Sequence, residues 1–279
     1  MDKEYNAMKY RIVATDLDKT LLNEKHQVPR RNKEAIRRAG EKGILVVPCT
    51  GRGPGFLGNL WEELELKRPG CYSILCNGAC VVENATGRLL TLRALAFETA
   101  EALLRLGTGR GYAVQLFTPD QVYIYNPRPQ DRMTAMQLGT NVVFCTGNEM
   151  DGLRGKPVLK LLYLQDAIQE EPKLGPLVEA ASEGKACYTY SNSDLMEINL
   201  AGVNKGTGLK DLAGILGIPM EETIGIGDNF NDMELIRAAG LGIAVSNAVP
   251  ELKAAAGAVT EADNSQGAVG EAICRFCGI

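Results

Sequence analysis

Four aspartates stand directly after apolar runs of this sequence, where they could handle a metal ion or a phosphate. Asp16 and Asp18 follow the first run, and Asp228 and Asp232 follow a run near the end of the chain. If they shared one crevice, their charges would repel by several kcal/mol unless a cation neutralised them. A hard divalent cation with oxygen ligands does so, and Mg²⁺ is the natural choice where a phosphate completes its shell. The sequence therefore predicts carboxylate chemistry at a Mg²⁺ site.

Two further polar groups stand at comparable positions. Thr50-Gly51-Arg52 follows an apolar run that starts at residue 44, and Lys205 opens a helical stretch. The chain has a single histidine, His26, which leaves little room for a Ser-His-Asp or multi-histidine site. Carboxylates must therefore supply most of the chemistry.

The elements that would position these groups alternate between strands and helices. Short apolar runs rich in branched residues predict strands, and amphipathic stretches predict helices. The strands are expected at 10–15, from 44, at 72–76, 223–226 and 241–245, and the helices from 29, at 56–66, 205–216, 232–239 and 250–256. This alternation predicts a parallel, doubly wound α/β sheet with helices on both faces. Ligands bind outside the carboxyl ends of such strands, so we expect the motifs to converge there.

The middle of the chain has a different pattern of predicted helices and strands. Longer amphipathic helices, expected at 98–106, 130–138 and 168–181, alternate with strands expected at 113–117, 122–125 and 158–164. This segment is long enough to bury its own core. We therefore predict a discontinuous catalytic core formed by residues 1–84 and 190–279, with an α/β domain inserted at 85–189.

Composition limits the classes of function. The 279 residues are 45% hydrophobic and 23% charged with a net charge of -4, which argues against a general nucleic-acid binder. The absence of an apolar run near ~20 residues and of an export signal predicts a cytoplasmic protein with no membrane partner. The eight cysteines are then expected as thiols, and Cys274 and Cys277 lack a second pair at zinc-site spacing.

The four motifs, in this order, resemble those of the haloacid-dehalogenase-like (HAD) hydrolases. They begin at Asp16, Thr50, Lys205 and Gly227, and the insert has the size and position of a class IIB cap. The chain is similar over nearly its whole length to the Cof-type phosphatases of that superfamily. The resemblance implies a Rossmann-like core with an inserted cap and Mg²⁺-dependent hydrolysis of phosphomonoesters through an aspartyl-phosphate.

The resemblance also implies catalytic roles. Asp16 would be the nucleophile that takes the phosphoryl group, and Asp18 the general acid and then the base that activates water. Lys205 would offset the negative charge that builds during transfer. Mg²⁺ would be held by the Asp16 carboxylate, the Asp18 main-chain carbonyl and the Asp228 carboxylate.

Other residues are implied to bind the phosphate or to support the site. Thr50 and the Gly51 amide would hydrogen-bond phosphate oxygens, and Asn231 would help to position the phosphate. Asp232 would support the metal or Lys205 from behind. Arg52 would either reach the substrate or form an ion pair at the seam between the domains.

The chain departs from the family pattern at two positions. Lys19 occupies the position after the second aspartate, where glycine is usual, so either the backbone there avoids positive φ or Lys19 is strained. Phe230 stands where small or acidic residues are commoner. Neither change removes a reacting group.

Two other functions remain open on the same scaffold. A phosphomutase or phosphotransferase would pass the phosphoryl group to a sugar, and a catalytically silent protein would only bind phosphorylated metabolites. The sequence leaves a sugar phosphate, a phosphorylated cofactor and a nucleotide as substrates, and it does not indicate an oligomeric state. A calcium loop at Asp16 is excluded because Leu21 and Gln27 replace its required glycine and glutamate.

Overall fold

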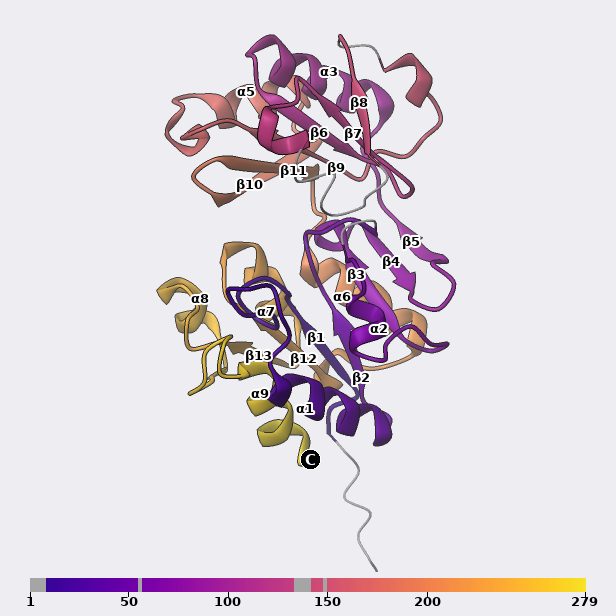
Figure 1. Cartoon of the computed structure of the whole chain (residues 1–279), viewed down its shortest axis with the longest axis vertical. Helices are drawn as coiled ribbons and strands as arrows, with labels where there is room; N and C mark the ends of the chain where they lie inside the picture. Colours follow the sequence, from indigo (N-terminus) through magenta and orange to yellow (C-terminus); the bar gives the residue numbers. More distant parts are fainter. Residues whose placement is uncertain (1–8, 55–56, 133–141, 148–149) are drawn as a thin grey trace, which may run out of the picture.

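A computed structural model describes residues 9–54, 57–132, 142–147 and 150–279 of the chain. Two lobes lie one above the other along the longest axis (Figure 1). The lower one, here called the core lobe, contains the first and the last of the described residues. The upper one, here called the cap lobe, runs from α3 (Phe97–Gly109) to β11 (Leu195–Leu200). Within the described residues, every helix is too short or too polar to cross a bilayer.

A five-stranded parallel sheet organises the core lobe. Its order is β14-β13-β12-β1-β2. The strands are β1 (Ile12–Thr15), β2 (Leu45–Pro48), β12 (Thr223–Gly227), β13 (Leu241–Ala244) and β14 (Ala258–Val259). Every neighbouring pair is parallel, so the carboxyl ends of all five strands meet at one edge. The predicted fold class is confirmed.

Helices cover both faces of this sheet because side chains alternate along its strands. Val13 of β1 packs in one apolar cluster with α1 (Arg30–Glu41) and α9 (Ala268–Cys277). Ile12 and Ala14 belong to a second cluster with α6 (Lys205–Leu216) and α7 (Met233–Ala238). A further helix, α8 (Pro250–Ala255), follows β13.

A three-stranded antiparallel sheet stands beside β2. It consists of β3 (Tyr72–Leu75), β4 (Cys80–Glu83) and β5 (Leu89–Leu92). One parallel bridge from Cys49 to Ile74 connects it to the end of β2. The carboxyl end of β3 is thereby added to the edge at which the parallel strands end.

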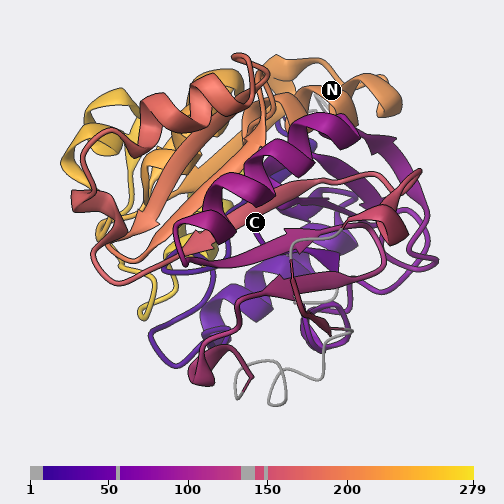
Figure 2. The ribbon, with the colours of Figure 1, turned by 90° about the horizontal axis from the view of Figure 1, so that it is seen from above.

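The cap lobe contains a six-stranded sheet of order β10-β11-β9-β6-β7-β8. Its helices α3 and α5 (Leu174–Ala181) pack on one face, as the view from above shows (Figure 2). Side chains of the opposite face join the apolar cluster of the core lobe. The strands are β6 (Ala113–Phe117), β7 (Val122–Tyr125), β8 (Val142–Cys145), β9 (Lys160–Leu164), β10 (Ala186–Asn192) and β11.

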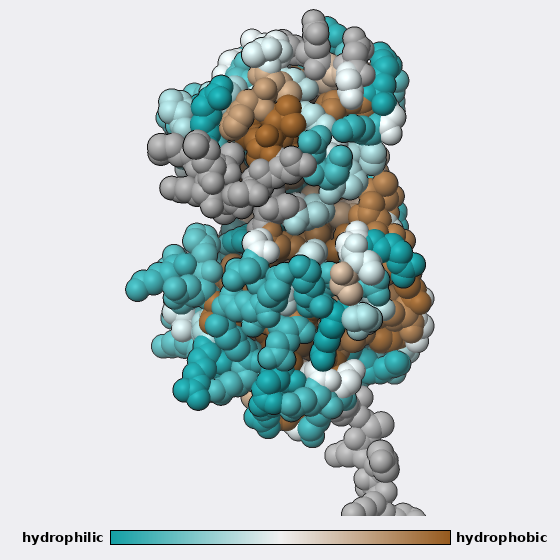
Figure 3. Space-filling model, turned by 45° about the vertical axis from the view of Figure 1, so that its right-hand side comes forward, coloured by the Kyte–Doolittle hydropathy of each residue, from teal (hydrophilic) through white to brown (hydrophobic). Residues whose placement is uncertain are grey.

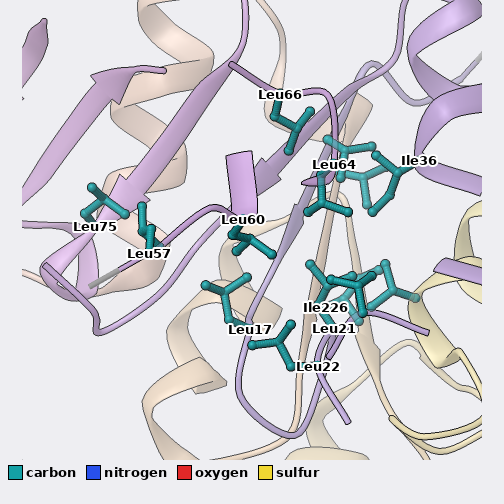
Figure 4. Close-up of a cluster of buried hydrophobic side chains, with 14 of the residues drawn as sticks. Leu17, Leu21, Leu22, Ile36, Leu57, Leu60, Leu64, Leu66, Leu75 and Ile226 are labelled. Atoms are coloured by element: carbon teal, nitrogen blue, oxygen red, sulfur yellow. The ribbon is translucent and has the colours of Figure 1, made fainter. Parts of the chain in front are cut away.

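Leucines fix the loop that carries the first two aspartates. Leu17, between Asp16 and Asp18, is fully buried together with Leu21. Figure 4 shows Leu17 beside Leu60 of α2 (Leu60–Glu63) and Leu21 beside Ile226. Burying each such side chain contributes about 1.5–3 kcal/mol, so these apolar residues anchor the loop.

Several predicted elements differ in extent. The helix expected at 56–66 is reduced to α2, and the one at 168–181 is divided into a short turn, Ile168–Glu170, and α5. Lys173 lies between these two with φ of 69°, which interrupts the helix. The helix expected at 130–138 falls mainly on residues outside the described ones. Strands β4, β5, β8, β10, β11 and β14 and helix α9 were not predicted.

The predicted domain boundaries remain a proposal. β5 pairs with β4 of the core lobe, whereas β10 and β11 pair into the sheet of the cap lobe. If sheet membership defines the domains, both boundaries move from 85 and 189 toward the C-terminus, to the ends of the 97–200 segment.

Candidate active site

Three buried carboxylates meet at the carboxyl ends of β1 and β12. These strands are neighbours, and the amide of Asp16 donates to the carbonyl of Ile226 at 2.9 Å. Oxygens of Asp16, Asp228 and Asp232 lie within 4.8 Å of one another. The predicted convergence of the first and last motifs is therefore present in the structure.

Lys205 lies between two of these carboxylates. Its fully buried ammonium donates to Asp16 Oδ1 and Asp232 Oδ1, each at 2.5 Å. Helix α6 fixes it as the first helical residue, because the Asn204 side chain caps the helix by accepting from the Thr207 amide at 2.9 Å. The sequence singled out the lysine but not this cap.

Both carboxylate oxygens of Asp232 accept hydrogen bonds from other residues of the site. Its Oδ2 accepts from the amides of Asp228 at 3.0 Å and Asn229 at 3.1 Å, while Oδ1 accepts from Lys205. Gly227 is required here, because a Cβ at that position would lie 2.4 Å from the Asp232 side chain. Asp232 therefore supports both the ammonium and the loop that carries Asp228.

Residues just after Asp18 complete this end of the site. The Thr20 hydroxyl donates to Asp228 Oδ1 at 2.9 Å, a contact that the sequence did not suggest. Lys19 has φ of 60°, so the backbone does adopt the left-handed conformation for which glycine is usual. Because a lysine replaces the usual glycine here, the backbone at Lys19 is locally strained.

The pKa values of Asp16 and Asp228 are both raised by burial and by neighbouring negative charge. Burial, with added repulsion from Asp232 and Asp228, raises the pKa of Asp16 well above its ordinary value despite the attraction of Lys205. Burial and Asp232 raise the pKa of Asp228 to about 6. Burial disfavours the Lys205 ammonium, but Asp16 and Asp232 outweigh it and raise the lysine pKa. One ammonium does not balance three carboxylates.

These donors fit a hard divalent cation. Asp16 and Asp228 offer buried carboxylate oxygens close together, which is the ligand type that Mg²⁺ prefers. Asp232 is occupied by Lys205 and by two amides, so it is suited to a supporting role and not to direct coordination.

The pKa of Asp228 leads to a prediction about pH. Because its pKa is near 6 in the folded protein and 3.8 ordinarily, the folded metal-free protein binds more protons between these values than the unfolded chain. Its free energy of unfolding should therefore fall as pH rises through this window. A bound cation would stabilise the ionised form of Asp228 and so offset this loss of stability. Thermal stabilisation by Mg²⁺ should therefore be small near pH 5 and larger near pH 7. Melting curves with and without Mg²⁺ check this; stabilisation that is larger near pH 5 would contradict it.

Asp18 lies at the mouth of the site. Its side chain is 45% exposed and is paired with Arg52, whose Nε donates to Oδ2 at 2.9 Å. His26, the single histidine, has Nδ1 3.3 Å from Asp18 Oδ1. Arg52 was expected either to reach the substrate or to form an ion pair. The structure contains an ion pair, and its partner is Asp18, a predicted catalytic residue.

The turn Thr50–Arg52 follows β2 and is held by hydrogen bonds to the end of β3. The Thr50 amide donates to the Ile74 carbonyl at 2.9 Å, and the Asn77 amide donates to the Thr50 carbonyl at 3.0 Å. The Thr50 hydroxyl oxygen accepts from the Arg52 amide at 3.1 Å. Its O–H therefore remains available as a donor toward a ligand.

A cleft of about 810 Å³ contains these groups and extends between the lobes. Figure 3 shows hydrophobic residues along the seam where the lobes meet. From the core lobe the cleft is lined by Asp16, Asp18, Lys19, His26, Thr50, Gly51, Arg52, Gly53, Asp228, Asn229 and Asn231. Lys205 and Asp232 lie behind it. The structure thus brings all the predicted site residues to one place.

The cap lobe supplies residues that the sequence did not identify. They share one face of its sheet, because Gln115 pairs with Leu162, Phe117 with Lys160, and Glu197 with Leu162. The residues that line the cleft are Gln115, Phe117, Lys160, Leu162, Leu195 and Glu197. Alternation along 113–117 could have indicated which residues share one face of that strand. The sequence did not indicate how distant strands pair, so the full set of residues on this face could not be predicted.

Comparison with known proteins agrees with this geometry. The model of the haloacid dehalogenase-like hydrolase family matches residues 13–273. A putative phosphatase, YxeH of Bacillus subtilis, is 28% identical over 92% of this chain and 95% of its own length. The B. subtilis 5-amino-6-(5-phospho-D-ribitylamino)uracil phosphatase YwtE is 28% identical, covering 91% of this chain and 94% of its own.

Solved structures share the fold over its full extent. A haloacid dehalogenase-like hydrolase from Bacteroides thetaiotaomicron superimposes with a TM-score of 0.82 at 26% identity, covering 95% of this chain and 99% of that one. A HAD subclass IIB sugar phosphatase gives 0.81 at 23% identity, covering 96% and 100%, which shows the fold. The resemblance inferred from the four motifs is confirmed: the chain belongs to the haloacid dehalogenase-like hydrolases.

Proposed function

We propose that this HAD-family phosphatase hydrolyses phosphomonoesters of small metabolites, with Mg²⁺ as cofactor and an aspartyl-phosphate on Asp16 as intermediate. The observation that carries the proposal is the position of Asp16: a buried carboxylate, in contact with Lys205, on the wall of the cleft. Thr50, Gly51 and Asn231 line the same cleft and offer hydrogen bonds to a phosphate.

The reaction divides into two displacements at phosphorus. In the first, a carboxylate oxygen of Asp16 attacks, the bond to the ester oxygen breaks, and Asp18 gives that oxygen a proton. In the second, Asp18 takes a proton from water, the water oxygen attacks phosphorus, and the bond to Asp16 breaks. Lys205 stabilises the charge at the attacked group in both steps, because it is fixed by Asp232 and needs no rearrangement.

Mg²⁺ would be held by the carboxylates of Asp16 and Asp228 and the main-chain carbonyl of Asp18. When bound, it would offset the charge of the phosphate and draw electron density from phosphorus. Without it, a phosphate dianion would enter a site that already has more carboxylates than ammonium groups.

The proposed substrate class is a small phosphorylated metabolite, either a sugar phosphate or a phosphorylated cofactor or nucleotide. Full-length relatives support a small metabolite, since YwtE is named for a phosphoribitylamino-uracil. The cap face over the cleft presents Phe117, Leu162 and Leu195, with Gln115 as its uncharged polar residue. We propose that this face contacts the alcohol part of the substrate.

Gln115→Leu tests that proposal. The Gln115 amide makes no hydrogen bond to the other described residues, so its removal leaves the fold intact and takes away one polar contact to the substrate. We expect the preference among phosphorylated metabolites to change by about tenfold, with little effect on p-nitrophenyl phosphate. Gln165→Leu, at an exposed glutamine of the same lobe, is the matched control. An unchanged order of substrates in both variants would rule out contact through Gln115.

Release of inorganic phosphate from a panel of phosphomonoesters tests the function as a whole. A phosphatase turns over repeatedly, a phosphomutase releases little phosphate, and a silent binder releases none. The last two results would replace the proposal by one of the alternatives left open by the sequence. Cytoplasmic localisation and the lack of a nucleic-acid partner stay predictions from the sequence.

A further inference from the structure

Lys160 and Glu197 form a buried ion pair on the face of the cap lobe that covers the cleft. Lys160 Nζ lies 2.8 Å from Glu197 Oε2, and their side chains are only 4% and 9% exposed. They come from neighbouring strands, β9 and β11. Two buried charges need more than each other, because desolvation of both costs several kcal/mol unless further hydrogen bonds compensate.

Those further hydrogen bonds go to the core lobe. Lys160 Nζ donates to the Gly51 carbonyl at 2.6 Å, and Asn77 Nδ2 donates to Glu197 Oε2 at 2.8 Å. Asn77 also holds the carbonyl of Thr50 through its main-chain amide. The turn Thr50–Arg52 therefore accepts hydrogen bonds from Lys160 of the cap lobe and from Asn77 of the core lobe.

Close approach at this point depends on glycine. A Cβ on Gly51 would lie 3.0 Å from Asn77 Oδ1 and 3.3 Å from Glu197 Oε2, tighter than ordinary contacts. The Phe117 ring lies 4.8 Å from the Lys160 ammonium and shields it from water. A charged donor on a carbonyl in such surroundings is stronger than a neutral one in water.

The Gly51 carbonyl belongs to the same peptide unit as the Arg52 amide. That amide donates to the Thr50 hydroxyl oxygen at 3.1 Å. Because a peptide unit is planar, holding the carbonyl also sets the direction of the amide, and an ammonium on the oxygen polarises the N–H. The orientation of the Thr50 hydroxyl thus depends on a lysine of the other lobe.

We propose that Lys160 is a positioning residue for phosphate binding. It acts through the Gly51–Arg52 peptide unit and orients Thr50 and Gly51 only when the cap lobe is closed on the core. The inference rests on the proposed function, since it takes Thr50 and Gly51 as phosphate ligands. It goes beyond that function by making phosphate binding depend on the position of the cap lobe.

Lys160→Met tests the proposal, because methionine keeps the packing against Phe117 and removes the ammonium. We expect kcat/KM for p-nitrophenyl phosphate to fall by about 10- to 100-fold, the effect of one charged hydrogen bond. Inhibition by inorganic phosphate should weaken with it, since both ligands use the turn Thr50–Arg52. Lys160→Arg should restore part of the loss. Lys156→Met is the matched control, because Lys156 pairs with Asp120 and Tyr123 on the cap lobe and lies outside the cleft.

A double variant separates positioning from the cost of leaving Glu197 unpaired. Lys160→Met with Glu197→Gln removes the buried charge, and glutamine still accepts from Asn77. We expect it to be as stable as the wild type and as impaired as Lys160→Met. Recovery of wild-type kcat/KM and phosphate inhibition in the double variant would overturn the proposal. So would a single variant that loses only thermal stability, with both kinetic values unchanged per folded molecule.

If the wild type hydrolyses no phosphomonoester, the proposed function is wrong and the role of Lys160 falls with it. If the wild type is active and Lys160→Met matches Lys156→Met, only the positioning role is wrong.

Discussion

Asp16→Asn is expected to lower kcat for phosphomonoester hydrolysis by about 10⁴-fold or more, the scale of loss when a catalytic nucleophile is removed. The amide has the shape of the carboxylate but neither its charge nor its nucleophilic oxygen. Steady-state phosphate release, normalised to folded protein, measures the effect.

The same substitution should leave the fold intact. Burial and two neighbouring carboxylates raise the pKa of Asp16, so its ionised form costs stability at neutral pH, and a neutral amide avoids that cost. The unfolding midpoint in the absence of metal is therefore expected at or above that of the wild type. Turnover above a tenth of wild type in a folded Asp16→Asn protein would disprove the nucleophile assignment.

Removal of divalent metal is expected to lower activity by roughly a thousandfold or more, because a cation supplies several kcal/mol of charge stabilisation. Oxygens of three buried carboxylates lie within 4.8 Å of one another around the proposed phosphate position, and two of the three carboxylates contact Lys205. Added phosphate would meet this negative charge without compensation. Assays after chelation with EDTA, followed by titration with Mg²⁺, measure the loss and its recovery.

Two comparisons sharpen the metal experiment. Ca²⁺ should not replace Mg²⁺, because its larger and looser shell misplaces the groups that must be in line. Asp228→Ala should raise the Mg²⁺ concentration needed for half activity or abolish activity, while Glu251→Ala, on α8 outside the cleft, should not. Full activity in the presence of chelator would show that the metal has no role.

The proposed catalytic residues of the core lobe could be predicted because each stands beside its own strand or helix end. Asp16 follows β1 directly and Lys205 begins α6, so a local pattern was sufficient to place them. The parallel sheet then brings these ends together irrespective of the details of packing. Lys19 shows the limit of such reasoning: its positive φ was one of two open possibilities, and the sequence could not choose between them.

The residues of the cap lobe could not be predicted, because their environment depends on contacts between distant segments. In β11, Met196 and Ile198 alternate with Glu197 and Asn199, a pattern typical of a strand with one face in water. The polar face is instead buried, since Glu197 lies against Asn77 of the core lobe. Likewise, nothing near Lys160 in the sequence indicates that it contacts Gly51, more than a hundred residues away.

The most direct test of the central claim is chemical identification of the phosphorylated residue. Wild type and Asp18→Asn would be mixed with substrate and Mg²⁺, quenched in acid during turnover and reduced with borohydride, which converts an aspartyl-phosphate to homoserine. Peptide mass spectrometry should then find homoserine in place of Asp16 only when substrate and Mg²⁺ are both present. The yield should be higher in Asp18→Asn, because that variant lacks the base that activates water for the second step. Active wild-type enzyme with an unmodified Asp16 in both proteins, or with the reduced product at another aspartate, would contradict the account.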